Sequence, residues 1–485
     1  MAKTGLLIFL VLIYLSSIHA IGDYCPYKVC SCFPPQIYCM RLNLTYLPPV
    51  ASVGILRYGY LVLDQNNITA VPAGRLPSNL TNISFTDNPI ATIALTAFDG
   101  SQNTLQTLSF SNARFTQIPL AFGRLHSLKQ LSIYDTKILV WDTDCLKNIG
   151  HTIQTLYLNN VGLTAWPGWL QYFLSLKELS IVQASISSVP DNCLDHVNRS
   201  LTSLTIMNTN ITSIPKTIAS LQSLTSLDLL DNKISDVTWI PQDSKLSSLS
   251  LNNNFITDAN VVSKVLRPLA KTLSDIELVG NRMTSFPDLS FLTHCEGFDL
   301  SNNRISNYTS GSLPPLTYEL NLGGNYLPAI PQFLSRALSL SDLVLSSNVI
   351  KYVRGQDLPP LVMELDLGYN LIIEIADDSF MPNSRIVSLS LNNNPIIRIS
   401  DVVFSNFPYL SELNLQSTKL TRLPLGLSSL TSLDSFDASD SKGLVCTCME
   451  KDLTAFFLKL QFVTGNCGAT SIYEFFTALS PSCPS

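Results

Sequence analysis

Charged side chains are scarce in this chain, and their shortage limits the functions that it can have. Asp, Glu, Lys and Arg together make up 14% of the 485 residues, and the formal net charge is −6. The 30 basic residues are scattered and form no run or patch. Because nucleic-acid binding depends on clustered Lys and Arg, the sequence gives no sign of that function.

Long apolar runs are missing as well, although 46% of the residues are hydrophobic. Beyond the N-terminus no run approaches the roughly 18 uninterrupted apolar residues of a transmembrane helix. The apolar stretch at residues 5–18 follows Lys3 and ends near the small residue Ala20. It predicts a signal peptide at residues 1–20, with an uncleaved anchor helix as the alternative. We therefore expect a secreted, extracellular chain without a membrane span in its mature part.

The sequence also lacks the motifs of catalysis, metal binding and cofactor binding. The four histidines beyond the signal peptide (His126, His151, His196 and His294) are far apart and show no metal-ligand spacing. There is no Gly-x-Ser-x-Gly motif, phosphate loop or dinucleotide fingerprint. His294 adjoins Cys295, but neighbouring residues on a strand point to opposite faces. We predict no enzyme activity, no cofactor and no metal.

One pattern fills most of the chain: Leu-x-x-Leu-x-Leu-x-x-Asn-x-Leu, with Ile, Val or Phe at the apolar positions. A clear copy is Leu224, Leu227, Leu229, Asn232 and Ile234. The copies number 17 and are spaced by 22 to 27 residues, which is typical of the leucine-rich repeat. Aligned on the Asn of the pattern (the Asn column), they fall at positions 66, 88, 113, 136, 161, 184, 209, 232, 254, 281, 303, 325, 348, 370, 394, 418 and 441.

The spacing of the apolar residues within each copy predicts the fold. Leu-x-Leu alternates as a strand with one buried face does, and the rest of the copy must return to start the next strand. No copy can bury its apolar side alone, so the copies stack around one continuous core. We expect an α/β solenoid over residues 53–443. It should be a leucine-rich-repeat horseshoe with a parallel sheet on the concave side and an irregular or short-helical convex side.

The Asn column is interrupted in the first half of the chain. A buried Asn can bond the bare backbone groups of the turn, because it carries both donors and an acceptor. Five consecutive copies lack it, and have Ala113, Thr136, Val161, Ala184 and Thr209 instead. We expect a locally different curvature between residues 105 and 215, and the alternative is that water fills the gaps.

Eight of the 11 cysteines flank the repeats in two clusters. A solenoid exposes its core at both ends, and a small cap needs disulfides to close it. Cys25-Pro26-x-x-x-Cys30-x-Cys32 with Cys39 resembles the N-terminal cap of extracellular leucine-rich-repeat proteins. Cys446-Thr447-Cys448 with Cys467 and Cys483 is similar to their C-terminal cap, but no Trp follows the Cys-x-Cys, so we expect Phe456 and Phe457 to fill its space. The resemblance implies caps at residues 21–52 and 444–485, and the pairs Cys25–Cys32, Cys30–Cys39, Cys446–Cys467 and Cys448–Cys483.

The other three cysteines, Cys145, Cys193 and Cys295, occupy positions that are apolar in neighbouring copies. We expect them to be free thiols that act as small buried hydrophobic residues. The alternative, a Cys145–Cys193 disulfide, would have to span two repeats, about 10 Å, whereas a disulfide needs Cα atoms within about 7 Å.

Seven Asn-x-Ser/Thr sequons are candidate glycan sites in a secreted chain, and we expect about half of them to be occupied. They are Asn43, Asn67, Asn79, Asn82, Asn198, Asn210 and Asn307. Asn82 lies on a predicted strand, so a glycan there would face the concave side.

The x positions around Leu-x-Leu should pave the concave sheet, which repeat proteins use for binding. In the first half this surface is nearly neutral, with Lys129 and Lys177. From Asp228 onward it becomes acidic, which predicts a surface that attracts a cationic partner. The alternative is a solvated face that only keeps the protein soluble. The acidic residues are Asp228, Asp231, Asp275, Glu277, Glu296, Asp299, Glu319, Asp342, Glu364, Asp366, Glu412, Asp434, Asp437 and Asp440.

The resemblance to extracellular leucine-rich-repeat proteins implies a recognition or adhesion protein that binds a protein or a glycan, without catalysis. The alternatives are a non-catalytic subunit of a secreted complex and a protein of innate-immune pattern recognition.

Overall fold

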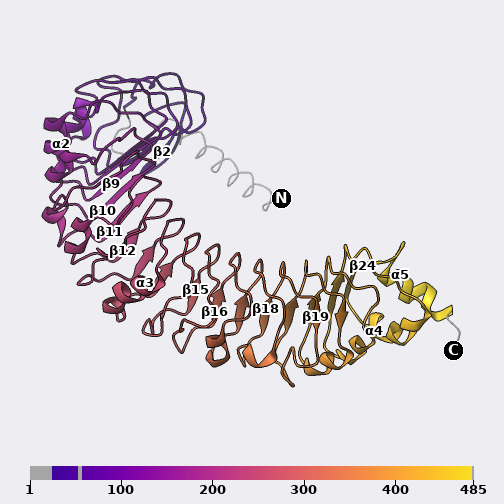
Figure 1. Ribbon diagram of the computed structural model, residues 1–485. Coiled ribbons are helices and arrows are strands. Elements are labelled where there is room, and N and C mark those ends of the chain that lie inside the picture. Colours follow the sequence, from indigo (N-terminus) through magenta and orange to yellow (C-terminus); the bar gives the residue numbers. More distant parts are fainter. Residues whose placement is uncertain (1–24, 53–56, 483–485) are drawn as a thin grey trace, which may run out of the picture. The chain divides into compact units, whose positions relative to one another are not determined.

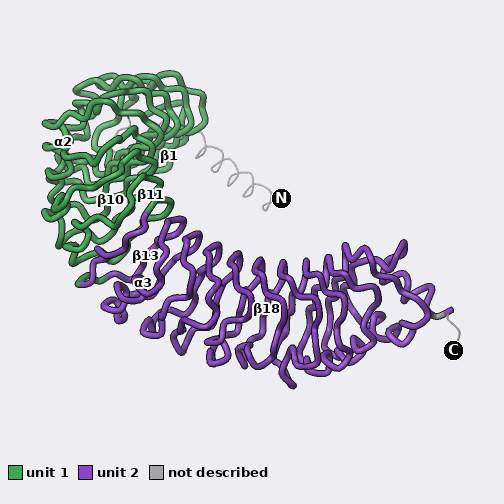
Figure 2. Tube along the Cα trace, viewed as in Figure 1, with its two compact units in different colours: residues 1–233, 243–245 green, residues 234–242, 246–485 purple. Residues whose placement is uncertain are grey.

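The computed structural model describes residues 25–52 and 57–482 (Figure 1). The predicted signal peptide and Cys483 lie outside these residues. The chain divides into two compact units (Figure 2). Unit 1 comprises residues 1–233 and 243–245, and unit 2 comprises residues 234–242 and 246–485. We describe each unit by itself.

Unit 1 begins with an antiparallel hairpin, β1 (Ser31–Phe33) and β2 (Gln36–Tyr38), and β2 starts a parallel ladder. The ladder continues through β3 (Tyr60–Val62), β5 (Asn82–Phe85), β7 (Thr107–Ser111), β8 (Gln130–Tyr134), β9 (Thr155–Asn159), β10 (Glu178–Val182), β11 (Ser203–Met207) and β12 (Ser226–Asp228). A second, short ladder pairs β4 (Ala70–Val71) with β6 (Thr92–Ile93).

The return segments of unit 1 are mostly single helical turns, on the side away from the main ladder (Figure 1). They are η2 (Asp99–Ser101), η3 (Leu120–Arg124), α2 (Thr143–Gly150), η4 (Gly168–Tyr172), η5 (Asp195–Val197) and η6 (Lys216–Ser220). Pro119, Pro167 and Pro215 precede η3, η4 and η6 in extended conformation. Proline suits this place because its ring sets φ and no N–H is lost from a hydrogen-bonded position.

Unit 2 has a main parallel ladder of its own, which runs into the C-terminal cap. Its strands are β13 (Ser248–Ser250), β14 (Asp275–Glu277), β15 (Gly297–Asp299), β16 (Glu319–Asn321), β17 (Asp342–Val344), β18 (Glu364–Asp366), β20 (Ser388–Ser390), β22 (Glu412–Asn414), β23 (Ser435–Ala438) and β24 (Phe462–Cys467). Smaller pairings join β19 (Glu374–Ile375) to β21 (Arg398–Ile399), and β24 to β25 (Thr470–Ser471).

Short helices also form the return segments of unit 2, and α4 and α5 gather at its C-terminal end (Figure 1). The segments are α3 (Ala259–Leu266), η7 (Arg267–Leu269), η8 (Gln332–Arg336), η9 (Gly355–Asp357), η10 (Asp401–Asn406), η11 (Leu425–Ser429), η12 (Cys448–Leu453), α4 (Thr454–Phe457), α5 (Ile472–Glu474), the π-helical η13 (Phe475–Leu479) and η14 (Ser480–Ser482).

Each of the 17 predicted repeats supplies one strand, and the middle residue of each three-residue strand from β12 to β18 is buried. The first and third residues are not buried. This alternation is what Leu-x-Leu requires of a strand with one face in the core. The predicted repeat and its parallel sheet are confirmed.

The Asn column ties neighbouring repeats together. Asn303, for example, donates to the Leu278 carbonyl of the preceding repeat (2.9 Å) and to the Leu300 carbonyl of its own (3.1 Å). Its Oδ1 accepts from the Met283 N–H (3.2 Å). One buried side chain thus satisfies backbone groups of two repeats, which explains its recurrence.

Where the Asn column is interrupted, the strands are longer. Strands β7 to β11 have five residues each, whereas β12 to β18 have three. In these repeats, which lack the Asn amide, the pairing of β7 with β8 continues beyond the third residue of each strand, to Phe110–Ile133 and Ser111–Tyr134. The different curvature that we expect for residues 105–215 stays a prediction.

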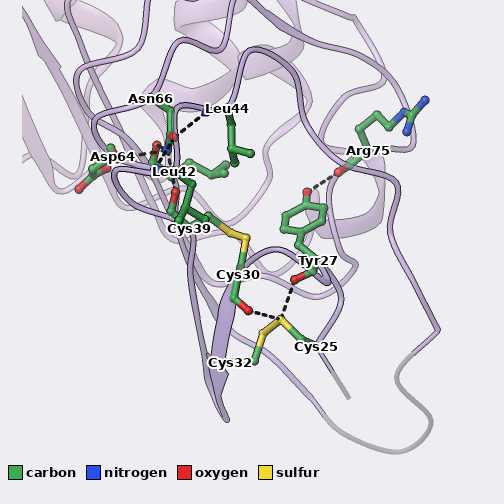
Figure 3. The surroundings of a disulfide bond; sticks show 11 residues. Cys25, Tyr27, Cys30, Cys32, Cys39, Leu42, Leu44, Asp64, Asn66 and Arg75 are labelled. Carbon is green, nitrogen blue, oxygen red and sulfur yellow. Dashed lines mark hydrogen bonds between the residues drawn. A yellow bond between two sulfur atoms is a disulfide. The ribbon is translucent and has the colours of Figure 1, made fainter. Parts of the chain in front are cut away.

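The N-terminal cap contains two of the expected disulfides, Cys25–Cys32 and Cys30–Cys39 (Figure 3). The first residue of the Asn column, Asn66, joins this cap to the repeats. Its Nδ2 donates to the Cys39 carbonyl (2.7 Å), and its Oδ1 accepts from two cap N–H groups.

In the C-terminal cap Cys446 pairs with Cys467, as the resemblance implies. Cys448 is disulfide-bonded too, and its expected partner Cys483 lies outside the described residues. Phe457 is buried, stacks on Phe476 (centroids 4.4 Å apart) and contacts Phe436 of β23 (5.4 Å). Aromatic rings therefore close this end of the core.

The three remaining cysteines are free thiols, as predicted. Cys145 and Cys295 are buried, but Cys193 is only half-buried, so the expectation that all three fill the core is wrong for Cys193. Cys193 lies in the turn before η5, whereas Cys145 lies within helix α2. Burial raises the pKa of each thiol from 9.0 to about 11.

Candidate functional site

The first and third residues of each strand point to the exposed face of the ladder. On the strands of the main ladder of unit 2 from β13 to β23, which leaves out β19 and β21, these positions hold nine acidic side chains and no Lys or Arg. We call this surface of unit 2 the acidic face. Its carboxylates are Asp275, Glu277, Asp299, Glu319, Asp342, Glu364, Asp366, Glu412 and Asp437.

Three of these carboxylates form a row on successive strands. Glu319, Asp342 and Glu364 are register partners on β16, β17 and β18. Parallel strands lie about 4.8 Å apart, so like charges stand side by side along the row. None of the five ion pairs found among the described residues includes a member of the row. The row is therefore a site of concentrated negative charge.

Apolar side chains border the carboxylate row. Tyr318 and Met363 directly precede β16 and β18, and their exposed fractions are 44% and 45%. Ser341, between them on the intervening repeat, donates to the Asp342 carboxylate (3.1 Å). The border allows a ligand to make apolar contacts beside the charges.

Other carboxylates of the face serve the fold. Asp299, Asp366 and Asp437 each accept a hydrogen bond from the backbone N–H two residues on, at 2.8, 2.9 and 2.8 Å. Asn321 and Asn414 do the same at the equivalent position, both at 2.9 Å. Such Asx turns satisfy an N–H where the strand ends.

Asp437 shows how these turns affect a carboxyl group. Burial raises its pKa, but hydrogen bonds from the Ser439 N–H and from the side chains of Thr464 and Ser439 outweigh burial and hold the pKa below its ordinary value. The charged form of this carboxylate is thus stabilised by its own turn.

The remaining carboxylates of the face contact neighbouring polar side chains. Ser248 donates to Asp275 (2.9 Å), and Ser250 and Asn252 donate to Glu277 (2.8 and 2.7 Å). The acidic face thus contains carboxylates with internal donors and, at Glu319 and Glu364, exposed carboxylates beside an apolar border. Glu412 accepts a longer hydrogen bond from Ser388 (3.3 Å).

Five of the predicted acidic residues lie outside the exposed strand positions of unit 2. Asp228, whose Oδ1 accepts from the Leu230 N–H (3.1 Å), and Asp231 lie in unit 1. Asp231 and Asp440 occupy left-handed turns that follow the strands. Glu296 and Asp434 directly precede β15 and β23 and are exposed.

Two features of the face were missed by sequence reasoning. One is the Asx turn, although the exchange of Asp for Asn at one repeat position, as in Asp299 and Asn321, could have indicated it. The other is the apolar border of Tyr318 and Met363, which becomes visible only when the strands are in register.

The exposed face of unit 1 is polar and carries little charge. Its main charged contact joins the Tyr157 hydroxyl to Glu178 (2.6 Å), and this hydrogen bond is the largest cause that raises the pKa of Tyr157 to about 12. Lys129 and Lys177 directly precede β8 and β10 and are exposed. Asn82 begins β5 and lies on this face, as expected.

The sequons are divided unequally: six lie in unit 1 and Asn307 lies in unit 2. Asn43, Asn67, Asn79 and Asn307 are exposed, whereas Asn82, Asn198 and Asn210 are half-buried. The Asn67 amide donates a hydrogen bond to Asn43 Oδ1 (2.5 Å), so the side chains of these two candidate glycan sites are in contact.

Among the described residues there is no group of three or more His, Cys, Asp or Glu side chains arranged to hold a metal ion. Within the same residues, no helix is long and apolar enough to cross a membrane.

No protein-family model and no curated protein matches the chain. Solved structures do match it. A leucine-rich-repeat protein of Leptospira interrogans aligns with a TM-score of 0.57 at 22% identity, over 79% of this chain and 90% of that one. The chain has the leucine-rich-repeat fold. The plant peptide hormone receptor RGFR1, in complex with RGF2, aligns with a TM-score of 0.52 at 18% identity, over 85% of this chain and 75% of the receptor. At identities of 22% and 18%, this structural similarity shows the fold alone.

Proposed function

We propose that this leucine-rich-repeat chain is a secreted, non-catalytic recognition protein that binds a cationic polypeptide on the acidic face. The observation that carries the proposal is the in-register row of Glu319, Asp342 and Glu364, bordered by Tyr318 and Met363. In this proposal residues 1–20 are a signal peptide, residues 21–52 and 444–485 are caps, and residues 53–443 are the repeats that present the face.

Electrostatics favours a basic ligand here. Carboxylates on adjacent strands repel one another, and a bound cation relieves that repulsion. A surface of one sign also steers an oppositely charged partner and speeds its association. Lys and Arg can lay their aliphatic stems on apolar surface while their charged ends reach the acids, which fits the border of Tyr318 and Met363.

Secretion is supported by the cysteine chemistry. Disulfides close both caps, three of them wholly within the described residues, and disulfides of this structural kind persist in oxidising, extracellular compartments. The seven sequons agree with that compartment, because glycans are added to chains that pass through the secretory route.

The proposal is tested by neutralising the row in the variant Glu319→Gln/Asp342→Asn/Glu364→Gln. The probe is a labelled peptide that alternates Lys or Arg with Leu, and its binding is followed by fluorescence anisotropy. We expect the wild-type affinity to fall about tenfold or more between about 0.05 and 0.5 M NaCl, because the screening length shortens about threefold. The triple variant should bind about tenfold more weakly than wild type at low salt, with a flatter salt dependence.

A matched control neutralises three exposed acids that lie off the sheet face of unit 2, in the variant Asp378→Asn/Asp452→Asn/Glu474→Gln. It changes the net charge by the same amount, so it should retain most of the binding. If both triple variants lose affinity equally, the net charge is responsible and the face only keeps the protein soluble. Binding that stays constant from low to high salt would contradict the proposal directly.

A further inference from the structure

Unit 2 carries a second notable surface, on the edge where the chain leaves each strand. Four consecutive repeats, with Asn325, Asn348, Asn370 and Asn394 in the Asn column, expose large apolar side chains there. Six of these side chains have exposed fractions between 44% and 59%. We call them the apolar edge: Tyr326, Tyr352, Tyr369, Leu371, Ile373 and Ile397.

Backbone hydrogen bonds join neighbouring repeats along the apolar edge. The Leu371 N–H donates to the Ile350 carbonyl (2.9 Å), and the Ile397 N–H donates to the Ile373 carbonyl (2.9 Å). Strands β19 and β21 pair beside them. The exposed residues Ile373 and Ile397 therefore lie on directly neighbouring segments of the chain. Contiguous apolar surface of this kind is rare on soluble monomers and marks interaction sites.

Cations stand at both ends of the apolar edge. The position directly after the Asn column is Tyr326, Val349, Leu371 and Pro395 in the four repeats. In the two preceding repeats the same position is Arg282 and Arg304, and in the two following repeats it is Lys419 and Lys442. Arg304, Lys419 and Lys442 are exposed, and Arg282 lies over the Phe255 ring (3.6 Å to the centroid). Within the edge, exposed Lys351 and Arg354 add positive charge, and Arg398 pairs with Glu374 (3.5 Å). The edge is therefore apolar and basic, with cations at both ends.

One sequon, Asn307, lies on this edge in the repeat before Tyr326, and no other sequon lies on the edge of unit 2. In unit 1 the position after the Asn column is a sequon in two repeats, at Asn67 and Asn210. No sequon occurs after Asn307, in residues 308–485. Glycans on Asn67 and Asn210 would cover this edge in unit 1, whereas the repeats from Asn325 to Asn394 in unit 2 carry no sequon.

We propose that the apolar edge docks a polypeptide whose apolar segment is flanked by acidic residues on both sides. The charge pattern selects this occupant. A second copy placed edge to edge about a twofold axis would bring basic end against basic end, which is repulsive. An acidic-apolar-acidic segment instead matches both ends and the centre. This partner differs in charge from the ligand of the acidic face, so the two surfaces can be tested independently.

Two variants test the apolar edge in the full mature chain. The first, Tyr326→Ser/Ile373→Ser/Ile397→Ser, removes exposed apolar area, and the second, Arg304→Glu/Lys419→Glu, reverses one cation at each end. A control, Leu338→Ser/Leu361→Ser/Leu458→Ser, truncates exposed leucines elsewhere in unit 2. Exposed substitutions disturb folding little, and circular dichroism checks this for every variant.

The probe is a synthetic peptide with a Leu/Ile/Phe centre and Asp/Glu on both sides, compared with the same peptide flanked by Lys. We expect wild type and control to bind the acid-flanked peptide, and both edge variants to bind it about tenfold or more weakly. Wild type should bind the Lys-flanked peptide far less well. The proposal is wrong if the edge variants match the control, or if wild type does not distinguish the two peptides.

Two further measurements test whether the apolar edge binds a membrane or a second copy of the chain instead. Sedimentation of wild type with phosphatidylserine vesicles tests a membrane, and sedimentation velocity over a range of protein concentrations tests a second copy. Suppose that wild type binds vesicles or self-associates, that the edge variants abolish this, and that the acid-flanked peptide does not bind. The partner of the apolar edge is then a membrane or a second copy, and the proposed polypeptide is wrong. A monomer that does not bind vesicles but binds the peptide supports it.

Discussion

Units 1 and 2 are built from the same repeat but present different surfaces. The exposed strand positions of the main ladder of unit 1 carry Glu178 and Asp228 as their acidic residues, whereas those of the main ladder of unit 2 carry nine. Six of the seven sequons belong to unit 1. The core pattern needs only the apolar and Asn positions, so the remaining positions are free to differ. The contrast therefore lies in surface charge and in candidate glycan sites, and not in the repeat that builds the core.

The two units also differ inside. Unit 2 has Asn in the column from Asn254 to Asn394 without a gap, and unit 1 has the five-repeat gap between Asn88 and Asn232. Within the gap the hydroxyl of Thr136 replaces part of the Asn bonding. It accepts from the Ala113 N–H (3.1 Å) and donates to the Tyr134 carbonyl (2.8 Å). The two units therefore satisfy the same turn in different ways.

The largest effect should come from removing an Asn of unit 2. Asn370 donates to the carbonyls of Leu345 and Leu367 (both 3.0 Å), and its Oδ1 accepts from the Ile350 N–H (3.0 Å). Asn370→Ala leaves buried backbone groups unpaired, so we expect a loss of about 3 kcal/mol in unfolding free energy. Urea denaturation measures the loss, and hydrogen exchange should show faster exchange at the Ile350 amide.

The matched change in unit 1 is Thr136→Val, which keeps the shape and removes the hydroxyl. The Ala113 N–H loses its partner, and the Tyr134 carbonyl loses one donor but keeps the Asn112 N–H, so we expect a loss of about 1 kcal/mol in unfolding free energy. Equal losses for Thr136→Val and Asn370→Ala would show that the two columns do not differ in their contribution to stability.

A smaller effect on the unfolding free energy should distinguish carboxylates that accept a backbone hydrogen bond in their own turn, such as Asp366, from exposed ones such as Glu364. Asp366→Ala removes the acceptor of the Gly368 N–H and should cost about 1 kcal/mol, whereas Asp366→Asn keeps an acceptor and should cost less. Glu364→Ala, two residues away, should change stability by no more than about 0.5 kcal/mol. Thermal unfolding of the three variants measures this order, and the distinction fails if Glu364→Ala is the most destabilising.

The smallest effect concerns the thiols, of which Cys145 and Cys193 lie in unit 1 and Cys295 in unit 2. With a pKa of about 11, about one thiol in a thousand is ionised at pH 8, so alkylation of the folded chain should be slow. Cys193 should react first because it is half-buried. Mass spectrometry after iodoacetamide treatment, with and without urea, measures this order, and faster labelling of Cys145 would contradict it.

The same thiols predict a pH dependence. Their pKa is 9.0 without burial and about 11 in the fold, so the unfolded chain ionises first as the pH rises. The stabilisation is complete below pH 9 and is lost as the pH approaches 11. Replacing all three cysteines with Ala should flatten the decline of stability in this window, and an unchanged decline would assign it to other groups.

Most of the fold could be predicted because its signals are local. Each Leu-x-Leu places one strand, and the cap cysteines of the N-terminus pair within ten residues of each other. The burial of Cys193 could not be predicted, because an equivalent repeat position can lie in a helix, as Cys145 does, or in the turn before one. Strand β24, which extends the ladder beyond the last repeat, has no Leu-x-Leu pattern to indicate it.

The sequence by itself determined the number of repeats, the parallel ladder and the cap cysteines, because a fixed apolar period leaves few ways to bury the core. Only the tertiary structure decided which exposed residues act together. The repeats differ in length, so their register decides that Glu319, Asp342 and Glu364 form one row while other acids cap their own turns. The same stacking places Ile397 beside Ile373, although the two residues are more than 20 positions apart in the chain.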